Sequence, residues 1–132
     1  KVLEVGTGSG YQAAVLIEMG AKVFSVERQR ELFLKAQILL PGLGYNPHLF
    51  FSDGNEGLPT YGPFDKIIIT AAAGEIPVKL LLQLKVNGIM VIPHGSRSSQ
   101  TMTKIVKTGE NAFEKTEHGE FAFVPMIKGT ES

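Results

Sequence analysis

The sequence predicts an α/β fold in which a mostly parallel sheet ends in antiparallel strands. Its first residues combine an apolar strand, a turn with three glycines and a helix, as a βαβ unit requires. Further apolar strands and helical segments then alternate to about residue 93. Beyond that point, strand-like segments follow one another without a helix between them, which is typical of antiparallel pairing.

Composition limits the classes of protein that the chain can represent. With 132 residues it is long enough to bury a core, and we expect one domain over residues 1–132. Thirteen basic and 13 acidic residues leave no net charge. This balance disfavours a nucleic-acid partner, because proteins that wrap nucleic acid carry a basic surplus. The chain has no cysteine, so we expect no disulfide, no thiol nucleophile and no cysteine-based metal site, and we expect no metal among the site residues.

The sequence has no visible targeting feature. No apolar run approaches the roughly 20 residues that cross a bilayer, and no signal peptide is visible. We therefore expect a cytoplasmic monomer that does not contact a membrane. The chain opens with Lys1 directly before a core strand and has no initiator Met, so we expect that an N-terminal segment is missing.

The first strand, turn and helix together form the element on which the functional prediction depends. Residues 2–5 are predicted to be a buried parallel strand because they are almost continuously apolar. Gly6, Gly8 and Gly10 then allow a sharp turn and a close approach of the backbone to a ligand. A helix over Tyr11–Met19 follows, with its free N–H groups directed at the turn. Such a turn is typical of a site for a polar or anionic ligand.

The glycine spacing leaves two classes of cofactor open. Residues 8–13, Gly-Ser-Gly-Tyr-Gln-Ala, formally fit the G-x-G-x-x-A pattern of dinucleotide enzymes. The strand ends at Val5, however, and counting from Gly6 places Tyr11 where the third glycine should stand. The run fits acid-x-G-x-G-x-G better, with Glu4 as the acid, and this resembles the first motif of S-adenosylmethionine-dependent methyltransferases. Glu4 would face the ammonium of that cofactor, and loop N–H groups would meet its carboxylate. The cofactor-binding residues expected in this segment are Glu4, Gly6, Thr7, Gly8, Ser9 and Gly10.

Acidic side chains also mark the ends of the next two strands. A strand over Lys22–Glu27 ends on Glu27, which lies 17 residues after Gly10, close to the roughly 20 that separate a glycine loop from a ribose-binding acid. Glu27 is therefore expected to accept both ribose hydroxyls. A strand over His48–Phe51 leads to Asp53-Gly54, and in a methyltransferase Asp53 would accept from the adenine amino group.

The remaining elements follow from apolar periodicity and from the positions of proline and glycine. We expect Pro93 to end its strand, and Ala71, Ala72 and Ala73 to leave room for a substrate beside the cofactor. The other expected elements are helices at Arg28–Leu40, ended by Pro41-Gly42, and at Pro77–Lys85; strands at Phe64–Thr70, Ile89–Pro93, Thr101–Lys107, Phe113–Lys115 and Phe121–Met126; a loop at Asn55–Pro63; and a turn at Asn87-Gly88.

The sequence contains few candidates for acid–base catalysis. We expect His48 to be a half-buried strand residue, His118 to be solvated in a hairpin, and His94 to lie in a loop on the ligand edge. A carboxylate acceptor is anionic at neutral pH, so methyl transfer to it needs no general base. The Asn/Asp-Pro-Pro-Tyr motif of amino-directed DNA methyltransferases is absent after the fourth strand, where residues 70–74 stand instead.

Taken together, these residues resemble the protein-L-isoaspartate O-methyltransferase family. The similar segments are residues 2–16, Val26-Glu27-Arg28, Asp53-Gly54, Pro63-Phe64-Asp65, 70–73, Ile76-Pro77, Gln83-Leu84, Val91-Ile92-Pro93, Gly95, Gln100 and Phe123-Val124-Pro125. The resemblance implies a Rossmann-like class I methyltransferase fold. It also implies S-adenosyl-L-methionine as cofactor and methylation of L-isoaspartyl carboxylates in damaged proteins as the activity. Arg28 and Gly54 join the expected cofactor site, while Ala71 to Ala73 and Val124 would line the peptide site.

The chain departs from the family in two places. The family's proposed active-site Ser lies in a Thr-Ile-Ser-x-Pro segment upstream of the first strand, so no catalytic residue can be assigned here. His94 stands where the family often has a small apolar residue. Three alternatives stay open: a non-catalytic S-adenosylmethionine-binding fragment, an NAD-dependent oxidoreductase, and a small-molecule or RNA methyltransferase on the same scaffold.

Overall fold

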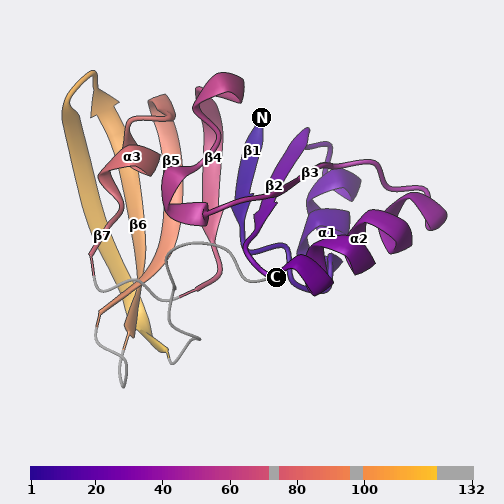
Figure 1. Ribbon diagram of the computed structural model, residues 1–132. Helices are drawn as coiled ribbons and strands as arrows, with labels where there is room; N and C mark the ends of the chain where they lie inside the picture. The colour runs from indigo at the N-terminus through magenta and orange to yellow at the C-terminus, as the bar shows by residue number, and fades with distance from the viewer. Residues whose placement is uncertain (72–74, 96–99, 122–132) are drawn as a thin grey trace.

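The computed structural model describes residues 1–71, 75–95 and 100–121 (Figure 1). Its seven strands form one sheet in the order β3-β2-β1-β4-β5-β6-β7. The strands are β1 (Val2–Val5), β2 (Val23–Glu27), β3 (His48–Phe51), β4 (Phe64–Ile69), β5 (Leu84–Gly95), β6 (Gln100–Gly109) and β7 (Ala112–Phe121). The helices are α1 (Tyr11–Glu18), α2 (Arg30–Gly42) and α3 (Val78–Leu81), and the 3-10 turns are η1 (Gly54–Glu56) and η2 (Pro59–Tyr61).

The predicted change from parallel to antiparallel pairing is confirmed. Strands β1 to β5 are paired in parallel, whereas β5, β6 and β7 are joined in antiparallel pairs. The central strand β1 lies between β2 and β4. The chain thus builds outward from β1 in one direction through α1 and α2, and in the other direction from β4 onward. In open α/β sheets, ligands bind outside the carboxyl ends of the strands at such a reversal point.

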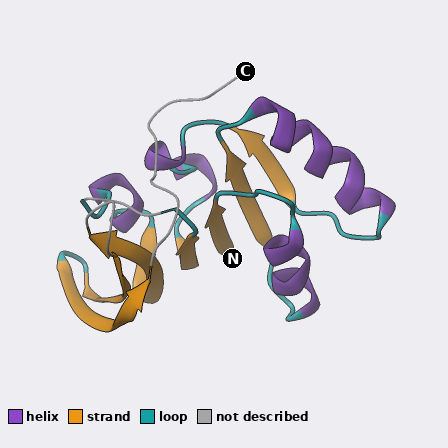
Figure 2. Cartoon of the chain, turned by 90° about the horizontal axis from the view of Figure 1, so that it is seen from below, coloured by secondary structure: helices purple, strands orange, loops and turns teal. Residues whose placement is uncertain are grey.

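The two faces of the sheet bury different apolar clusters. Helices α1 and α2 lie together on one face (Figure 2), where the buried residues are Ala13, Val23, Ala36 and Leu40. A larger cluster fills the opposite face and includes Leu58, from the segment between β3 and β4, and Leu80 from α3. Burial of these side chains in two layers is the main source of stability in a domain of this kind.

Helix α2 begins and ends two residues later than the sequence predicted. Pro41 was expected to end it, but the helix includes Pro41 and continues to Gly42. A proline in the last turn is tolerated because it removes only one backbone hydrogen bond, the one that its N–H would have donated to the carbonyl four residues earlier. The Tyr45 N–H donates to Leu40 O at 2.9 Å, and Gly44, with φ of 89°, redirects the chain.

The prediction for residues 77–95 was wrong in three respects. The helix expected over Pro77–Lys85 is limited to α3, because Leu84 already pairs with Phe64 in the sheet. The turn expected at Asn87-Gly88 is a bulge inside β5, with Asn87 at φ of 70°. Pro93 does not end this strand, because the antiparallel pairing with β6 includes Pro93 and extends β5 to Gly95.

The predicted antiparallel pairing of the C-terminal hairpin is confirmed, but both of its strands are longer than expected. Its turn is formed by residues 110–111, and β7 continues without interruption to Phe121. The strand predicted over Phe121–Met126 therefore begins on the last residue of β7, and its other residues lie outside the described part of the chain. Within the described residues, no helix is long and apolar enough to cross a membrane.

Candidate functional site

The carboxyl ends of four neighbouring strands gather most of the predicted site residues at one edge of the sheet. The glycine loop, residues 6–10, follows β1, and Glu27 is the last residue of β2. Asp53 follows β3, and Thr70 follows β4. The parallel register of these strands, which pairs Val5 with both Val26 and Ile69, keeps the four ends level. The sequence therefore predicted correctly which segments share this edge.

Two of the three loop glycines show why the loop has this sequence. Gly6 adopts a φ of +104°, and a Cβ at this position would overlap Thr70 Oγ1. Packing against β4 therefore requires a glycine here. Gly8 has a φ of +54°, and no atom of the described residues lies within 4 Å of the place where its Cβ would stand. The open side of the loop is thus at Gly8, where a ligand can approach the backbone.

Glu27 holds this loop by direct hydrogen bonds. Its Oε1 accepts from the Gly8 N–H at 2.8 Å, and its Oε2 accepts from the Gln29 N–H at 2.9 Å. The side chain is only 5% exposed. A carboxylate has about four acceptor positions, so two of them remain for other donors. Glu27 thus connects the start of α2 to the loop after β1 and keeps acceptor capacity at the site.

Glu4 acts on the same loop through other side chains. It is 0% exposed, and its two oxygens accept from Ser25 Oγ at 2.6 Å and from Gln12 Nε2 at 2.9 Å. Because the Ser25 hydroxyl proton is directed at Glu4, the Thr7 hydroxyl donates to Ser25 Oγ, across 2.6 Å. Thr7 is therefore tied to Glu4 through Ser25. The contact expected between Glu4 and the ammonium of the cofactor stays a prediction.

Burial controls the protonation of Glu4. Removal from water raises its pKa above the ordinary value of 4.5, and the nearby charge of Glu27 raises it further. The hydrogen bonds from Ser25 and Gln12 oppose this change because they favour the charged form. The net result is a pKa above the usual range for a glutamate.

Thr70 joins β4 to the glycine loop. Its backbone N–H donates to Val5 O at 3.1 Å, and its Oγ1 donates to Val5 O at 3.1 Å and to Gly6 O at 3.3 Å. Ala71, expected at the peptide site, comes next in the chain and is half-buried. The position of Thr70 therefore fixes where the chain leaves β4 relative to the loop.

Asp53 begins a compact turn at the end of β3. Its Oδ1 accepts from the Asn55 N–H at 2.9 Å and from Asn55 Nδ2 at 3.2 Å. Gly54, the first residue of η1, is buried. The carboxylate is therefore held in one orientation by the turn that follows it.

The other predicted site residues have varied positions. Arg28 follows Glu27 and is half-buried, and Ser9 is exposed, with its Oγ 3.4 Å from the Tyr11 nitrogen that donates to it. Ala72, Ala73 and Val124 lie outside the described residues.

Two expectations for the histidines were wrong. His48 is exposed rather than half-buried: it lies on β3, the edge strand, and its ring stacks on Phe24 with centroids 4.7 Å apart. His94 belongs to β5, where it pairs with Thr101, and not to a loop, since the antiparallel pairing with β6 extends β5 to Gly95. The side chain of His118 is outside the described residues.

The sequence interpretation missed three residues that support the site. Ser25 and Gln12 bind Glu4, and Thr70 binds the loop. A signal for Ser25 was available, since a serine between Phe24 and Val26 in a buried strand needs a polar partner. Gln12 and Thr70 carry no such local signal, because exposed helices and strand ends commonly contain these residue types.

Comparison with known proteins identifies the family. The family model of protein-L-isoaspartate(D-aspartate) O-methyltransferases matches residues 1–131. The chain belongs to this family. Among its relatives, the protein-L-isoaspartate O-methyltransferase of Flavobacterium psychrophilum is 58% identical over 129 residues, and that of Christiangramia forsetii is 56% identical over 129 residues. Both alignments cover 97% of this chain and 60% of the relative.

Solved structures of the same family share the fold. One protein-L-isoaspartate O-methyltransferase superposes with a TM-score of 0.86 and 28% identity, over 98% of this chain and 43% of the other. A further structure, described as a beta-aspartate methyltransferase from Plasmodium falciparum, has a TM-score of 0.76 at 24% identity and covers 96% of this chain and 65% of the other. The Rossmann-like class I methyltransferase fold is thus established. The chain spans about 60% of the length of the curated relatives it matches.

Proposed function

We propose that residues 1–132 form a single S-adenosyl-L-methionine-binding domain, which transfers a methyl group to the free carboxylate of L-isoaspartyl residues in damaged proteins. One observation carries the proposal. In a member of the isoaspartate O-methyltransferase family, the open Gly8 and the buried Glu27 are hydrogen-bonded to each other at the reversal point of the sheet. This arrangement places an acid and an accessible backbone where an adenosyl group can bind.

The residues at this edge fit the proposed cofactor. Within residues 1–71, 75–95 and 100–121, no atom lies near the Gly8 Cβ position, which leaves space for the cofactor. Among the described residues, the loop N–H groups of Thr7 and Ser9 have no partner and are available to a carboxylate, whereas those of Gly6, Gly8 and Gly10 are already bonded. Glu27 would accept from the ribose hydroxyls, Asp53 from the adenine amino group, and Glu4 would complement the ammonium. Arg28 and Gly54 complete the proposed set.

Methyl transfer requires the protein to position the acceptor oxygen beside the methyl group and to exclude water from the site. The bound cofactor supplies a methyl group on a sulfonium, which is already activated for displacement. An isoaspartyl carboxylate is anionic at neutral pH, so the protein need not remove a proton from it. The chain would contribute by holding the acceptor oxygen in line with the methyl group. Thr70 supports this role because its bonds to Val5 and Gly6 fix the exit of β4 beside the cofactor loop.

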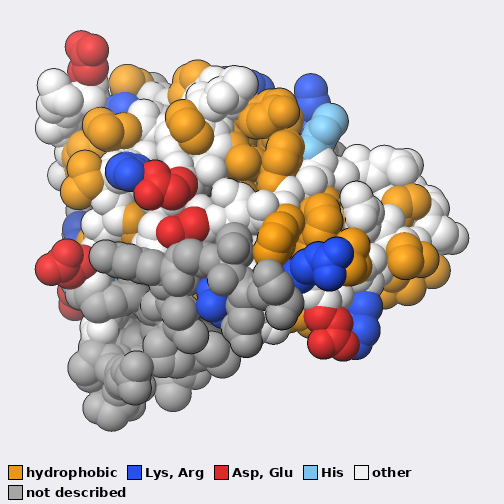
Figure 3. Space-filling model, viewed as in Figure 1, with side chains coloured by type: hydrophobic (Ala, Val, Ile, Leu, Met, Phe, Trp, Pro, Cys, Tyr) orange, Lys and Arg blue, Asp and Glu red, His pale blue; other side chains and the backbone are white. Residues whose placement is uncertain are grey.

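The substrate and the setting belong to the same proposal. Ala71, Ala72, Ala73 and Val124 would line the peptide site, and isoaspartyl peptides and proteins would be the partners. On the face shown in Figure 3, basic and acidic side chains are interspersed, and neither forms a broad field. This distribution supports a protein substrate over a nucleic acid. We further propose a cytoplasmic, monomeric protein that acts in protein repair.

A non-catalytic binding protein is the second candidate. The chain spans about 60% of the length of its curated relatives, so a chain that binds the cofactor without transferring its methyl group deserves a direct test. Calorimetry with S-adenosylhomocysteine measures binding alone. Transfer of a labelled methyl group to an isoaspartyl peptide, against the same peptide with normal aspartate, measures activity and selectivity.

These two measurements separate the candidates. We expect binding of S-adenosylhomocysteine and methylation of the isoaspartyl peptide but not of its aspartyl twin. Binding without transfer to either peptide would support the non-catalytic candidate. No heat with S-adenosylhomocysteine would refute both, and equal methylation of the two peptides would remove the repair assignment.

A further inference from the structure

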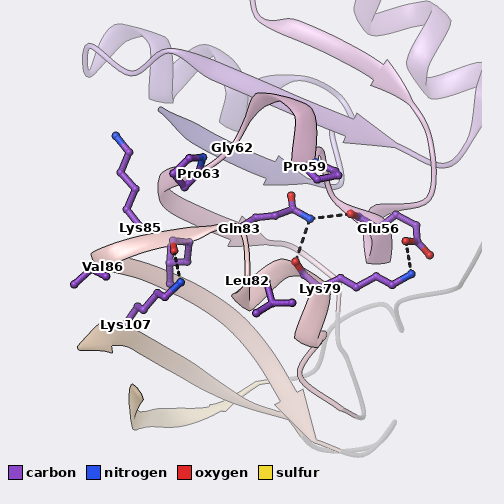
Figure 4. Close-up of a pocket in the computed structure, with 11 residues that line it drawn as sticks. Glu56, Pro59, Gly62, Pro63, Lys79, Leu82, Gln83, Lys85, Val86 and Lys107 are labelled. Atoms are coloured by element: carbon purple, nitrogen blue, oxygen red, sulfur yellow. Dashed lines mark hydrogen bonds and ion pairs between the residues drawn. The ribbon is translucent and has the colours of Figure 1, made fainter. Parts of the chain in front are cut away.

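Gln83 is a buried amide that joins the start of β5 to the turn after β3. It is 7% exposed. Its Oε1 accepts from the Leu58 N–H at 2.8 Å, and its Nε2 donates to Glu56 O at 2.9 Å and to Lys79 O at 3.0 Å. Figure 4 shows the last two bonds, with the amide lying between the η1 turn and α3. Both amide hydrogens and the amide oxygen therefore hold backbone groups in place.

The turn is shaped to receive this amide. Gly57 has a φ of +63°, and a Cβ there would overlap Gln83 Oε1 and approach Leu80 Cδ2 to 2.7 Å. Only a glycine lets the backbone lie this close to the Gln83 side chain. The contact is thus built from both sides, by a glycine in the turn and by a glutamine beside α3.

The same turn carries Asp53. The Glu56 N–H donates to Asp53 O at 3.1 Å, and the Gly57 N–H donates to Gly54 O at 3.2 Å. The carboxylate of Asp53 is held by Asn55 inside this turn. Because Gln83 binds the carbonyl of Glu56, whose N–H binds Asp53, a shift of the amide would be passed directly to Asp53.

A second link between the same elements is weak. Lys79 Nζ and a carboxylate oxygen of Glu56 form an ion pair at 2.6 Å, also drawn in Figure 4, but their side chains are 64% and 54% exposed. Exposed ion pairs of this kind contribute little, because water and salt screen them. The hydrogen bonds of the buried Gln83 side chain are therefore expected to stabilise the contact between the turn and α3 more than this ion pair does.

We propose that Gln83 is a positioning residue that fixes Asp53 and so determines selectivity for adenine. The inference depends on the proposed function, in which Asp53 accepts from the adenine amino group. In an inosyl ligand a carbonyl oxygen replaces that amino group and would face the Asp53 carboxylate. A firmly held Asp53 discriminates strongly between the two bases, whereas a loosened one turns away from the carbonyl oxygen and discriminates less.

The test compares two ligands on four proteins. Calorimetry gives the dissociation constants of S-adenosylhomocysteine and S-inosylhomocysteine for the wild type, Gln83→Met, Gln83→Glu and Lys79→Met. Met has a similar size but makes none of the three bonds, and Glu keeps the acceptor for Leu58 while losing both donors. Lys79→Met is the matched control, because it breaks the exposed ion pair and keeps the Lys79 carbonyl. All measurements are made below the melting temperature of each variant, with folding checked by circular dichroism.

We expect the wild type to prefer the adenosyl ligand by about 10-fold or more, the worth of one well-placed hydrogen bond. Both Gln83 variants should reduce this ratio to about 2-fold or 3-fold, and Lys79→Met should preserve it. If Gln83→Met fails to fold, Gln83→Glu and Gly57→Ala, which displaces the amide, test the same ratio.

Each other outcome overturns a different statement. An unchanged ratio in folded Gln83 variants, or an equal loss of affinity for both ligands, would show that Gln83 only stabilises the fold. A wild type that binds both ligands equally would show that Asp53 does not read the base. A wild type that binds neither ligand would refute the proposed function itself, and the inference with it.

Discussion

Replacement of Glu27 by glutamine is the sharpest test of the candidate site, because one carboxylate makes two measurable contributions. Its two oxygens accept from the Gly8 and Gln29 N–H groups at 2.8 and 2.9 Å. In Glu27→Gln one oxygen becomes an amino group that faces a backbone N–H, so one bond is lost and the other is no longer charge-assisted. We expect the free energy of unfolding to fall by about 1.5–3 kcal/mol, the range for a buried hydrogen bond to a charged group.

The same substitution should weaken the binding of the cofactor. Glu27 is proposed to accept from the ribose hydroxyls, and Gly8, which it holds, forms the open side of the loop. Loss of one such interaction corresponds to an affinity for S-adenosylhomocysteine that is about 10-fold to 100-fold lower. Urea unfolding measures the first effect and calorimetry the second. Glu18→Gln is the matched control, because Glu18 is exposed and, within the described part of the chain, accepts a hydrogen bond only from Tyr45 Oη, at 2.7 Å.

Glu27 is expected both to hold the glycine loop and to support cofactor binding, and each expectation can fail separately. A loss of stability below about 0.5 kcal/mol, the scatter of ordinary surface substitutions, would show that the two backbone bonds do not hold the loop. A normal affinity in a clearly destabilised variant would separate the loop from the cofactor. The second result would also remove Glu27 from the proposed ribose site.

Three further predictions concern the loop, its buried acid and the core. Gly6→Ala should lower the free energy of unfolding by about 2–3 kcal/mol, since it forces a left-handed alanine against Thr70, whereas Gly20→Ala, with positive φ but open space, should lose only about 1 kcal/mol in urea unfolding. Because the pKa of Glu4 is raised in the folded state, the folded protein binds the carboxyl proton of Glu4 more tightly than the unfolded chain does. The free energy of unfolding should therefore fall as the pH rises from about 4.5 through the pKa of Glu4 in the folded state. In Glu4→Gln this fall should be absent, and a pH series of urea unfolding that leaves the wild-type slope intact would contradict the argument. Leu80→Ala should cost about 2–5 kcal/mol because Leu80 is 0% exposed, and the exposed neighbour Leu82→Ala should stay within about 0.5 kcal/mol in thermal unfolding.

Local sequence signals were sufficient for the first half of the chain. The strand at residues 2–5, the glycine loop and the helix that starts at Tyr11 were all predicted, because each depends on neighbours in sequence. Glu27 and Asp53 could be placed at the same edge for a topological reason. Parallel strands end on one side, so an acid at the end of each strand must come near the loop.

Contacts between distant residues account for what the sequence did not predict. The segment after Pro77 has helical periodicity, but the pairing of Leu84 with Phe64 commits it to the sheet. The bond between Gln83 and Leu58 spans 25 residues, and the bond between Ser25 and Glu4 spans 21. Neither pair leaves a periodic pattern in the sequence. The elements were therefore easier to predict than the side chains that hold the site together.

The two acids at the glycine loop favour a cationic cofactor over a dinucleotide. Glu27 contacts the loop directly, and Glu4 is linked to it through Ser25 and Thr7. A dinucleotide would bring a pyrophosphate to this loop, and its negative charge would raise the already raised pKa of Glu4 still further. S-adenosylmethionine instead brings a sulfonium and an ammonium, whose positive charges would favour the charged form of Glu4. An acid on the ribose side is common to both cofactor classes, so Glu27 does not distinguish them. The buried Glu4 does, because its charged form is disfavoured by a pyrophosphate and favoured by a cationic cofactor.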